Sequence, residues 1–322
     1  MKIEEELDAE RKDKKNPKPK VEPQPTNYGE KPIGLSLNSF GYSVINTSVI
    51  GANHEEKDLP NQDASAVVQY FYKGKPLTIL AVADGHGSKK YSRSETGAFF
   101  AVHTVQLVLN EFLLNTASFN ETSIKNIFKN RDIYKDIHSK WLELVKEHVK
   151  KNPKNRANPD SKSSIQQYGT TLLFAIIYEE KIYISALGDG SIYIVRRLSD
   201  GGIKIDNVFE EDSLQVGLGT DSMINPRATH RFKQKLCSIK DFNSKIEMIL
   251  LTTDGMVDSL ENPSKSIEDM FYKTRENGLD WLRKTLPRQL AKWSKDGVGD
   301  DMTNIVYFFD QKNDKLLDSK DI

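Results

Sequence analysis

Short apolar stretches bounded by turn residues recur along the middle of the chain and predict β-strands. They are rich in β-branched and aromatic residues, as strands of a folded core are. The predicted strands cover residues 42–50, 64–72, 77–83, 169–178, 181–187, 191–197, 246–253 and 303–309. The turn at residues 73–76 predicts a hairpin, and the three strands within 169–197 predict a β-meander.

Other segments carry apolar residues at helical spacing. One such pattern follows Ser92-Arg93-Ser94-Glu95, which is predicted to be a capping box, and continues to Phe112. Further helices are predicted over residues 123–150, near 265–275 and over 278–294. Residues 198–245 are polar and contain several glycines, so they predict a long irregular insertion or flap.

The order of these elements favours an α+β fold. The long βαβ alternation that a doubly wound parallel sheet requires is missing from the predicted series. Two antiparallel sheets packed face to face and covered by helices fit the order better. Within 322 residues, we expect one domain over 33–310.

The two ends of the chain differ from this domain in composition. Residues 1–32 are charged and rich in proline, with almost no apolar side chains to bury, which predicts a disordered arm. Residues 311–322 are polar and are expected to form a frayed tail.

Charge and cysteine content exclude several classes of protein. The 46 basic and 46 acidic residues balance, which argues against a general binder of nucleic acids or membrane surfaces. The single cysteine, Cys237, excludes an internal disulfide and a cysteine-based zinc cluster. Without a bilayer-spanning apolar stretch or a signal-peptide core, we expect a cytoplasmic protein.

Acidic residues stand where several of the apolar stretches end. Asp84, Asp189 and Asp254 each lie beside a glycine just after a predicted strand, and the pair Asp300-Asp301 precedes the last one. Strand ends of this kind are expected to bring carboxylates to one rim of a β core. Carboxylates at close range repel one another unless a cation lies between them. The sequence therefore predicts an oxygen-ligand site for Mg²⁺ or Mn²⁺.

Six motifs in a fixed order carry a family resemblance. They are Asn61-Gln62-Asp63-Ala64, Asp84-Gly85-His86-Gly87, Gly169-Thr170-Thr171, Gly188-Asp189-Gly190-Ser191, Thr253-Asp254-Gly255 and Asp300-Asp301-Met302-Thr303. Together they resemble the metal-dependent, 2C-type serine/threonine protein phosphatases, and in particular their divergent bacterial branch. The resemblance runs from about Tyr42 to Phe309 and implies a four-layer α-β-β-α sandwich with a dinuclear Mg²⁺ or Mn²⁺ centre.

The resemblance also implies roles for the acidic residues. Asp84 matches a carboxylate shared by both metals, and Gly85 would lend its backbone carbonyl to one of them. Asp254 and Asp300 match the carboxylates that complete the first metal's shell. In such a centre two metals can hold a bridging hydroxide and direct it at phosphorus.

Other matched positions support this centre. Asp63 matches an acidic residue that binds ordered metal waters, and Asp189 matches one that holds a weaker third metal. His86 matches the general acid that protonates the departing serine or threonine oxygen, a step suited to an unperturbed pKa of about 6.5.

The chain departs from the family pattern at one residue near the metals and at one that binds phosphate. Gln62 stands where the family often has glutamate, so a neutral amide would orient a metal-bound water in place of a charged carboxylate. The arginine that grips phosphate upstream of this motif is absent. His54 is the candidate replacement and Lys57 the reserve, with Lys89, Lys90 and Arg93 as further possible sources of phosphate affinity.

Three functions remain open at this point. The preferred one is a phosphoprotein phosphatase acting on phosphoserine or phosphothreonine, partnered by a cognate kinase system and without nucleic-acid or membrane partners. The second is a catalytically weak regulatory module of the same fold. The third is a metal-dependent hydrolase of small phosphate esters.

Overall fold

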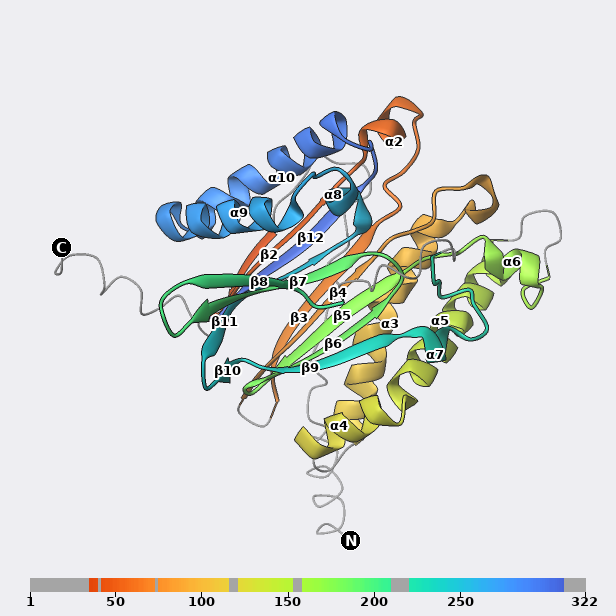
Figure 1. Ribbon diagram of the computed structural model, residues 1–322. Helices are drawn as coiled ribbons and strands as arrows, with labels where there is room; N and C mark the ends of the chain where they lie inside the picture. The colour runs from red at the N-terminus through yellow and green to blue at the C-terminus, as the bar shows by residue number, and fades with distance from the viewer. Residues whose placement is uncertain are drawn as a thin grey trace, which may run out of the picture.

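The computed structural model describes residues 35–39, 42–72, 75–115, 121–152, 158–209 and 220–309. They form four layers, with helices on both outer faces of two stacked sheets (Figure 1). This confirms the predicted α+β sandwich. The predicted arm (1–32) and tail (311–322) lie outside the described residues.

The first sheet is antiparallel throughout and has the strand order β1-β2-β12-β11-β7-β8, with β10 also paired to β11. Its strands are β1 (Leu35–Ser39), β2 (Tyr42–Val49), β7 (Ser191–Leu198), β8 (Ile203–Asn207), β10 (Lys240–Asp241), β11 (Ser244–Thr252) and β12 (Met302–Phe308).

The second sheet is also antiparallel and has the order β3-β4-β5-β6-β9. Its strands are β3 (Ala64–Tyr72), β4 (Lys75–Ala83), β5 (Leu172–Tyr178), β6 (Lys181–Leu187) and β9 (Lys233–Ser238). The predicted hairpin joins β3 to β4, with Tyr72 paired to Lys75.

Long helices cover the two outer faces of the sandwich. α3 (Ser94–Asn115) and α5 (Asp132–Lys151) cover the second sheet, and α9 (Pro263–Asn277) and α10 (Leu279–Asp296) cover the first (Figure 1). The shorter helices are α2 (Ala52–Glu56), η1 (Lys89–Tyr91), α4 (Glu121–Lys129), α6 (Lys162–Gln166), α7 (Ala228–Arg231) and α8 (Asp254–Asp258). No helix among the described residues combines the length and apolar character needed to cross a membrane.

Alternation along the strands builds three apolar layers. In β12, Ile305 and Tyr307 pack between the sheets, whereas Val306 and Phe308 pack under α9 and α10. β5 is buried at every position because α3 covers one of its faces and the first sheet covers the other. Each fully buried aliphatic side chain contributes about 1.5–3 kcal/mol relative to exposure, so these layers stabilise the stacked sheets.

The predicted meander over 169–197 is wrong at its second turn. β5 and β6 pair, but β7 belongs to the other sheet, so residues 188–190 cross between the layers. Gly188 makes this crossing possible with φ +111°, in a region where side-chain-bearing residues are strained. Asp189 therefore lies on a connection from one sheet to the other rather than at a hairpin tip.

Two other expectations are corrected. Residues 198–245 contain β8, α7, β9 and β10 rather than a wholly irregular insertion, because β8 pairs with β7 at the edge of one sheet and β9 pairs with β6 at the edge of the other. The helix predicted over 123–150 is two helices, α4 and α5, separated at Arg131 (φ +61°). The Arg131 guanidinium stabilises this break by donating to the carbonyls of Thr229 (2.9 Å) and Phe232 (2.7 Å).

Ser92 does not act as the predicted cap of α3. The first helical carbonyl belongs to Arg93, which accepts from the Gly97 backbone N–H at 3.0 Å. The Ser92 hydroxyl instead donates to Gln167 Oε1.

Candidate metal centre

Strand pairing brings the acidic strand ends to one end of the sandwich. Ala83, the last residue of β4, pairs with Ala64, so Asp84 and Asp63 lie beside one another. Near the ends of β11 and β12, Thr252 pairs with Asn304, which brings the segments that carry Asp254 and Asp300 together. The segments that carry these residues are far apart in the sequence.

A pocket of about 440 Å³ opens at this end of the molecule. Its lining residues are Asp84, Gly85, His86, Gly87, Ser88, Tyr91, Asp189, Thr220, Asp254 and Asp300. Most of the site residues predicted from the sequence thus line this one pocket. Asp63 and His54 are not among its lining residues.

Three carboxylates from different strand ends approach closely enough to share a cation. One oxygen from each of Asp84, Asp189 and Asp254 lies within 4.8 Å of the other two. Thr220 stabilises Asp189 by donating its hydroxyl hydrogen to Oδ2. Hard oxygen donors at this spacing suit Mg²⁺ or Mn²⁺.

The carboxylates are electrostatically unfavourable without a cation. Burial raises the pKa of Asp84 well above its usual range, and the neighbouring Asp63, Asp254 and Asp300 raise it further. Burial is also the main cause that raises the pKa of Asp254 to about 6. Buried like charges of this kind are stabilised by a bound cation, so the donor set fits a divalent metal.

Asp258 belongs to the same electrostatic cluster and was not predicted. Its pKa is raised first by burial and then by Asp189 and Asp300. It lies four residues after Asp254 in α8, and positions i and i+4 share a helix face. The four-residue spacing from Asp254 could have identified Asp258 from the sequence.

Asp63 is buried beneath the pocket. Its Oδ2 accepts from the Thr253 hydroxyl at 2.8 Å, and Thr253 Oγ1 in turn accepts from the Thr303 backbone N–H at 3.0 Å. Burial and then Asp301 raise its pKa well above the usual range. This position behind the lining residues is compatible with its predicted supporting role.

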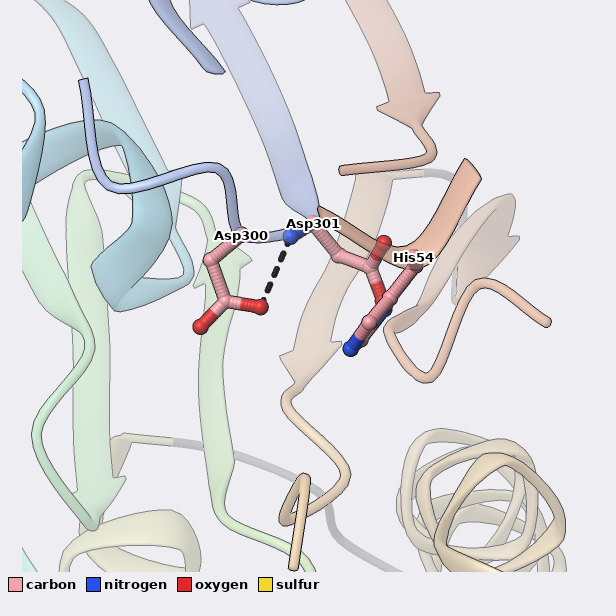
Figure 2. Close-up of side chains that lie close together, drawn as sticks. All are labelled: His54, Asp300 and Asp301. Carbon is pink, nitrogen blue, oxygen red and sulfur yellow. Dashed lines mark hydrogen bonds and ion pairs between the residues drawn. The ribbon is translucent and has the colours of Figure 1, made fainter. Parts of the chain in front are cut away.

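Asp301, whose role was not predicted, anchors the loop that precedes β3. It is 3% exposed. Its Oδ1 accepts from the Gly51 N–H at 2.6 Å, and its Oδ2 accepts from the Gln62 N–H at 2.6 Å and contacts His54 Nδ1 at 2.9 Å. Its own backbone N–H donates to Asp300 Oδ1 at 2.9 Å. Figure 2 shows the consequence: Asp300 and Asp301 point to different sides, with His54 against Asp301.

His54 is held mainly by this contact. Its hydrogen bond with Asp301 is the largest cause that raises its pKa, and burial acts in the opposite direction. One nitrogen of the ring lies within 4.8 Å of a carboxylate oxygen of both Asp300 and Asp301. Because Nδ1 is engaged, the predicted grip on phosphate would have to use Nε2.

Glycines allow the backbone to approach closely beneath the pocket. A Cβ on Gly85 would lie 2.6 Å from the Gln62 carbonyl oxygen, and the Gly85 N–H donates to that oxygen at 3.1 Å. A Cβ on Gly255 would lie 2.1 Å from the Asp301 carbonyl oxygen. No other residue type fits at either position without moving the acidic segments apart.

Gln62 carries a buried acceptor that faces the pocket region. Its Oε1 has no hydrogen-bond partner within the described residues. It lies 3.6 Å from where a Cβ on Gly87 would be. Buried acceptors without a partner are costly, so this oxygen is suited to a bound water or ion.

The basic residues considered for phosphate binding differ in availability. Arg93 is buried, and its guanidinium donates to the Tyr168 hydroxyl (2.6 Å) and the Asn152 carbonyl (2.7 Å), so it is not available to the pocket. Lys57, Lys89 and Lys90 are exposed. The Lys90 ammonium lies 4.7 Å from the centre of the Tyr91 ring.

His86 lies on the pocket wall beside an aromatic residue that was not predicted. The His86 backbone N–H donates to the Gly169 carbonyl at 3.1 Å, and the imidazole packs against the ring of Tyr91. Burial is the main cause that lowers the pKa of His86. Nothing in the sequence marked Tyr91, because its contact with His86 depends on how the turn folds.

The chain is similar to known phosphatases in both sequence pattern and fold. The protein phosphatase 2C family matches residues 50–293. A serine-threonine phosphatase 2C from Toxoplasma gondii is similar over 86% of this chain and 98% of its own, with 13% identity and a TM-score of 0.56. The serine/threonine phosphatase Stp1 from Staphylococcus aureus is similar over 86% of this chain and 98% of its own, with 18% identity and a TM-score of 0.53.

A bacterial serine phosphatase gives the same result, over 83% of this chain and 97% of its own, with 18% identity and a TM-score of 0.53. No curated protein matches the sequence. At these identities the solved structures establish the shared fold.

Proposed function

Because the chain belongs to the protein phosphatase 2C family, we propose that it is a Mg²⁺- or Mn²⁺-dependent phosphatase that hydrolyses phosphoserine and phosphothreonine in proteins. One observation carries the proposal. Carboxylates from remote strand ends, among them Asp84, Asp254 and Asp300, meet in one pocket at the end of both sheets. Carboxylates that raise one another's pKa destabilise a folded protein unless a cation offsets their charge, so a cation-free scaffold would gain nothing from them.

The donor set supports specific assignments for two metal ions. We assign Asp84 as the carboxylate that both ions share, since Asp254 and Asp300 both act on its pKa. Asp254 and Asp300 would hold one ion, and the Gly85 carbonyl would serve one of the two. Asp189 lies on the crossing between the sheets, close to Asp84 and Asp254, and is assigned to a weaker third ion. When bound, such ions activate water and offset the charge of the phosphate.

His86 is assigned as the general acid for the leaving oxygen. It lines the pocket with the carboxylates, and within the described part of the chain its ring nitrogens make no hydrogen bond to protein. A free imidazole nitrogen beside the reacting group can deliver a proton to a departing alkoxide. His54 is assigned to the phosphate through Nε2, and Asp63 supports the centre from below.

The substrate and partner assignments rest on the family. Proteins of this fold described as serine or serine-threonine phosphatases support a phosphorylated protein as substrate. A kinase that phosphorylates the same serine or threonine residues would then complete the cycle.

Metal-dependent turnover tests the proposal directly. Purified protein is incubated with a phosphothreonine peptide and Mn²⁺, with and without EDTA, and released phosphate is measured. Asp254→Asn is expected to abolish turnover. Asp296→Asn, which changes an exposed Asp-Gly turn at the end of α10, is the matched control and should keep it. Folded wild-type protein without Mn²⁺-dependent phosphate release would exclude the phosphatase function.

A regulatory module with weak catalysis is the second candidate. Gln62 and the engagement of His54 Nδ1 by Asp301 favour it, because both weaken charge-assisted contacts that the family commonly has. Calorimetric titration with Mn²⁺ separates the two functions. Tight binding with turnover supports the phosphatase, whereas a folded protein that binds no Mn²⁺ supports the module.

A further inference from the structure

Two side chains that line the acidic pocket, His86 and Tyr91, are in contact, and Lys90 lies beside the second. The ring centres of His86 and Tyr91 are 4.8 Å apart, with 53° between the ring planes. The Lys90 ammonium lies 4.7 Å from the centre of the same Tyr91 ring. Tyr91 ends the short helix η1 and, like His86, lines the pocket.

The backbone of Gly169 lies directly against both rings, which leave no space for a side chain at this position. A Cβ on Gly169 would lie 2.7 Å from His86 Cδ2 and 2.7 Å from Tyr91 Cδ1. The His86 backbone N–H is fixed to the carbonyl of this same glycine at 3.1 Å. The imidazole of His86 and the ring of Tyr91 therefore both pack on the Gly169 backbone, and each restricts the rotation of the other.

The orientation of the His86 ring depends on this aromatic contact. A histidine that donates protons in catalysis is commonly oriented by a hydrogen bond to one ring nitrogen. Among the described residues, no side chain or carbonyl makes that bond to His86. The ring contact with Tyr91 is therefore the contact that we expect to set the plane of the imidazole, and both imidazole nitrogens stay available.

We propose that Tyr91 is a positioning residue, which holds the imidazole of His86 toward the leaving group, with Lys90 fixing the Tyr91 ring. The inference rests on the proposed phosphatase function and on the assignment of His86 as the acid. It requires the aromatic ring and not the hydroxyl. Aromatic pairs of this geometry have energies that correspond to roughly a 2- to 12-fold change in an equilibrium, which sets the expected size of the effect.

Kinetics with two leaving groups tests the role. With a phosphothreonine peptide, Tyr91→Ala should lower kcat roughly 2- to 12-fold and leave KM unchanged. With para-nitrophenyl phosphate, whose leaving group needs little protonation, the same variant should lose much less. Tyr91→Phe should behave as the wild type with both substrates. In a His86→Ala background, Tyr91→Ala should cause no further loss.

A spectroscopic measurement reads the contact without activity. The NMR signal of the His86 Cδ2 proton should carry a ring-current shift that persists in Tyr91→Phe and disappears in Tyr91→Ala. Tyr272→Ala, which removes a half-exposed aromatic residue from α9 on the other face of the molecule, is the matched control and should change neither signal nor kinetics. Thermal unfolding of each variant identifies any general loss of structure.

The outcomes separate this inference from the function on which it rests. Wild-type protein without Mn²⁺-dependent turnover removes the phosphatase function and the role of Tyr91 together. If the wild-type protein is active, three results would overturn only the role of Tyr91. Tyr91→Ala slows turnover of both substrates equally, Tyr91→Phe is as slow as Tyr91→Ala, or the His86 Cδ2 proton has the same chemical shift in Tyr91→Ala as in the wild type.

Discussion

Asp300 and Asp301 are adjacent in the chain, yet their substitution by asparagine should have opposite effects on stability. Asp301 is buried and accepts from the backbone N–H groups of Gly51 and Gln62 and contacts His54. Asp300 is exposed and adds to the repulsion that Asp84 experiences. We therefore expect Asp301→Asn to destabilise the metal-free protein and Asp300→Asn to leave it unchanged or slightly more stable.

The magnitude for Asp301→Asn follows from counting its acceptors. The amide keeps one oxygen, so its NH₂ group must face the N–H of either Gly51 or Gln62, and that buried donor loses its acceptor. An unsatisfied buried donor costs about 1–3 kcal/mol, and hydrogen bonds to a charged acceptor are stronger than those to an amide by about 1 kcal/mol. The expected loss in free energy of unfolding is therefore about 2–4 kcal/mol.

Urea unfolding in EDTA measures both variants. Asp301→Asn should shift the midpoint with an unchanged m-value, and Asp300→Asn should stay within about 0.5 kcal/mol of wild type, as surface substitutions usually do. Added Mn²⁺ should then stabilise the wild type and not Asp300→Asn. Equal losses in both variants, or a loss below about 1 kcal/mol for Asp301→Asn, would refute the anchoring role of Asp301.

The pH dependence of the Asp301→Asn effect gives an independent check. The hydrogen bond with Asp301 raises the pKa of His54. Protonated His54 therefore contributes stability that is fully present below its unfolded pKa, about 6.5, and that is lost as the pH rises through its higher folded pKa. Asp301→Asn should accordingly cost more at pH 6 than at pH 8.

Three further predictions concern the acidic pocket. Since the folded pKa of Asp254 is about 6 against 3.8 for the ordinary group, the metal-free protein should lose stability as the pH rises from about 4 to 6, and Asp254→Asn should flatten that slope in urea titrations. Gln62→Glu should tighten Mn²⁺ binding measured by calorimetry, because it adds a charge at an acceptor that now has no partner; weaker binding would contradict the assignment. Gly255→Ala should prevent folding or destabilise the protein by more than about 3 kcal/mol, because its Cβ would overlap the Asp301 carbonyl oxygen; a native circular dichroism melt would contradict this.

The sequence predicted those parts of the fold and site that depend on local pattern. Strands with alternating apolar residues were recognisable, and so were the acids that follow them, because carboxylates are seldom buried and stand out at the end of an apolar run. Asp84, Asp254 and Asp300 therefore meet as expected.

Features that depend on pairing between distant segments were missed. Whether β7 pairs with β6 or crosses to the other sheet is decided by packing across the sandwich, which residues 188–190 do not encode beyond their glycines. No role was predicted for Asp301, because only the positions of Gly51 and Gln62 in space reveal it as an acceptor for their N–H groups. Tyr91 was missed because its partner, His86, lies against it only after the turn has folded.

The acids of the pocket come from both sheets. Asp84 follows a strand of one sheet, Asp254 follows a strand of the other, and Asp189 lies on the crossing that joins the two. If these acids hold metal as proposed, neither layer alone offers the full set of ligands, so an ion would bind only after the layers have docked. Binding that late would lengthen the lifetime of the native state and leave the time needed to reach it unchanged.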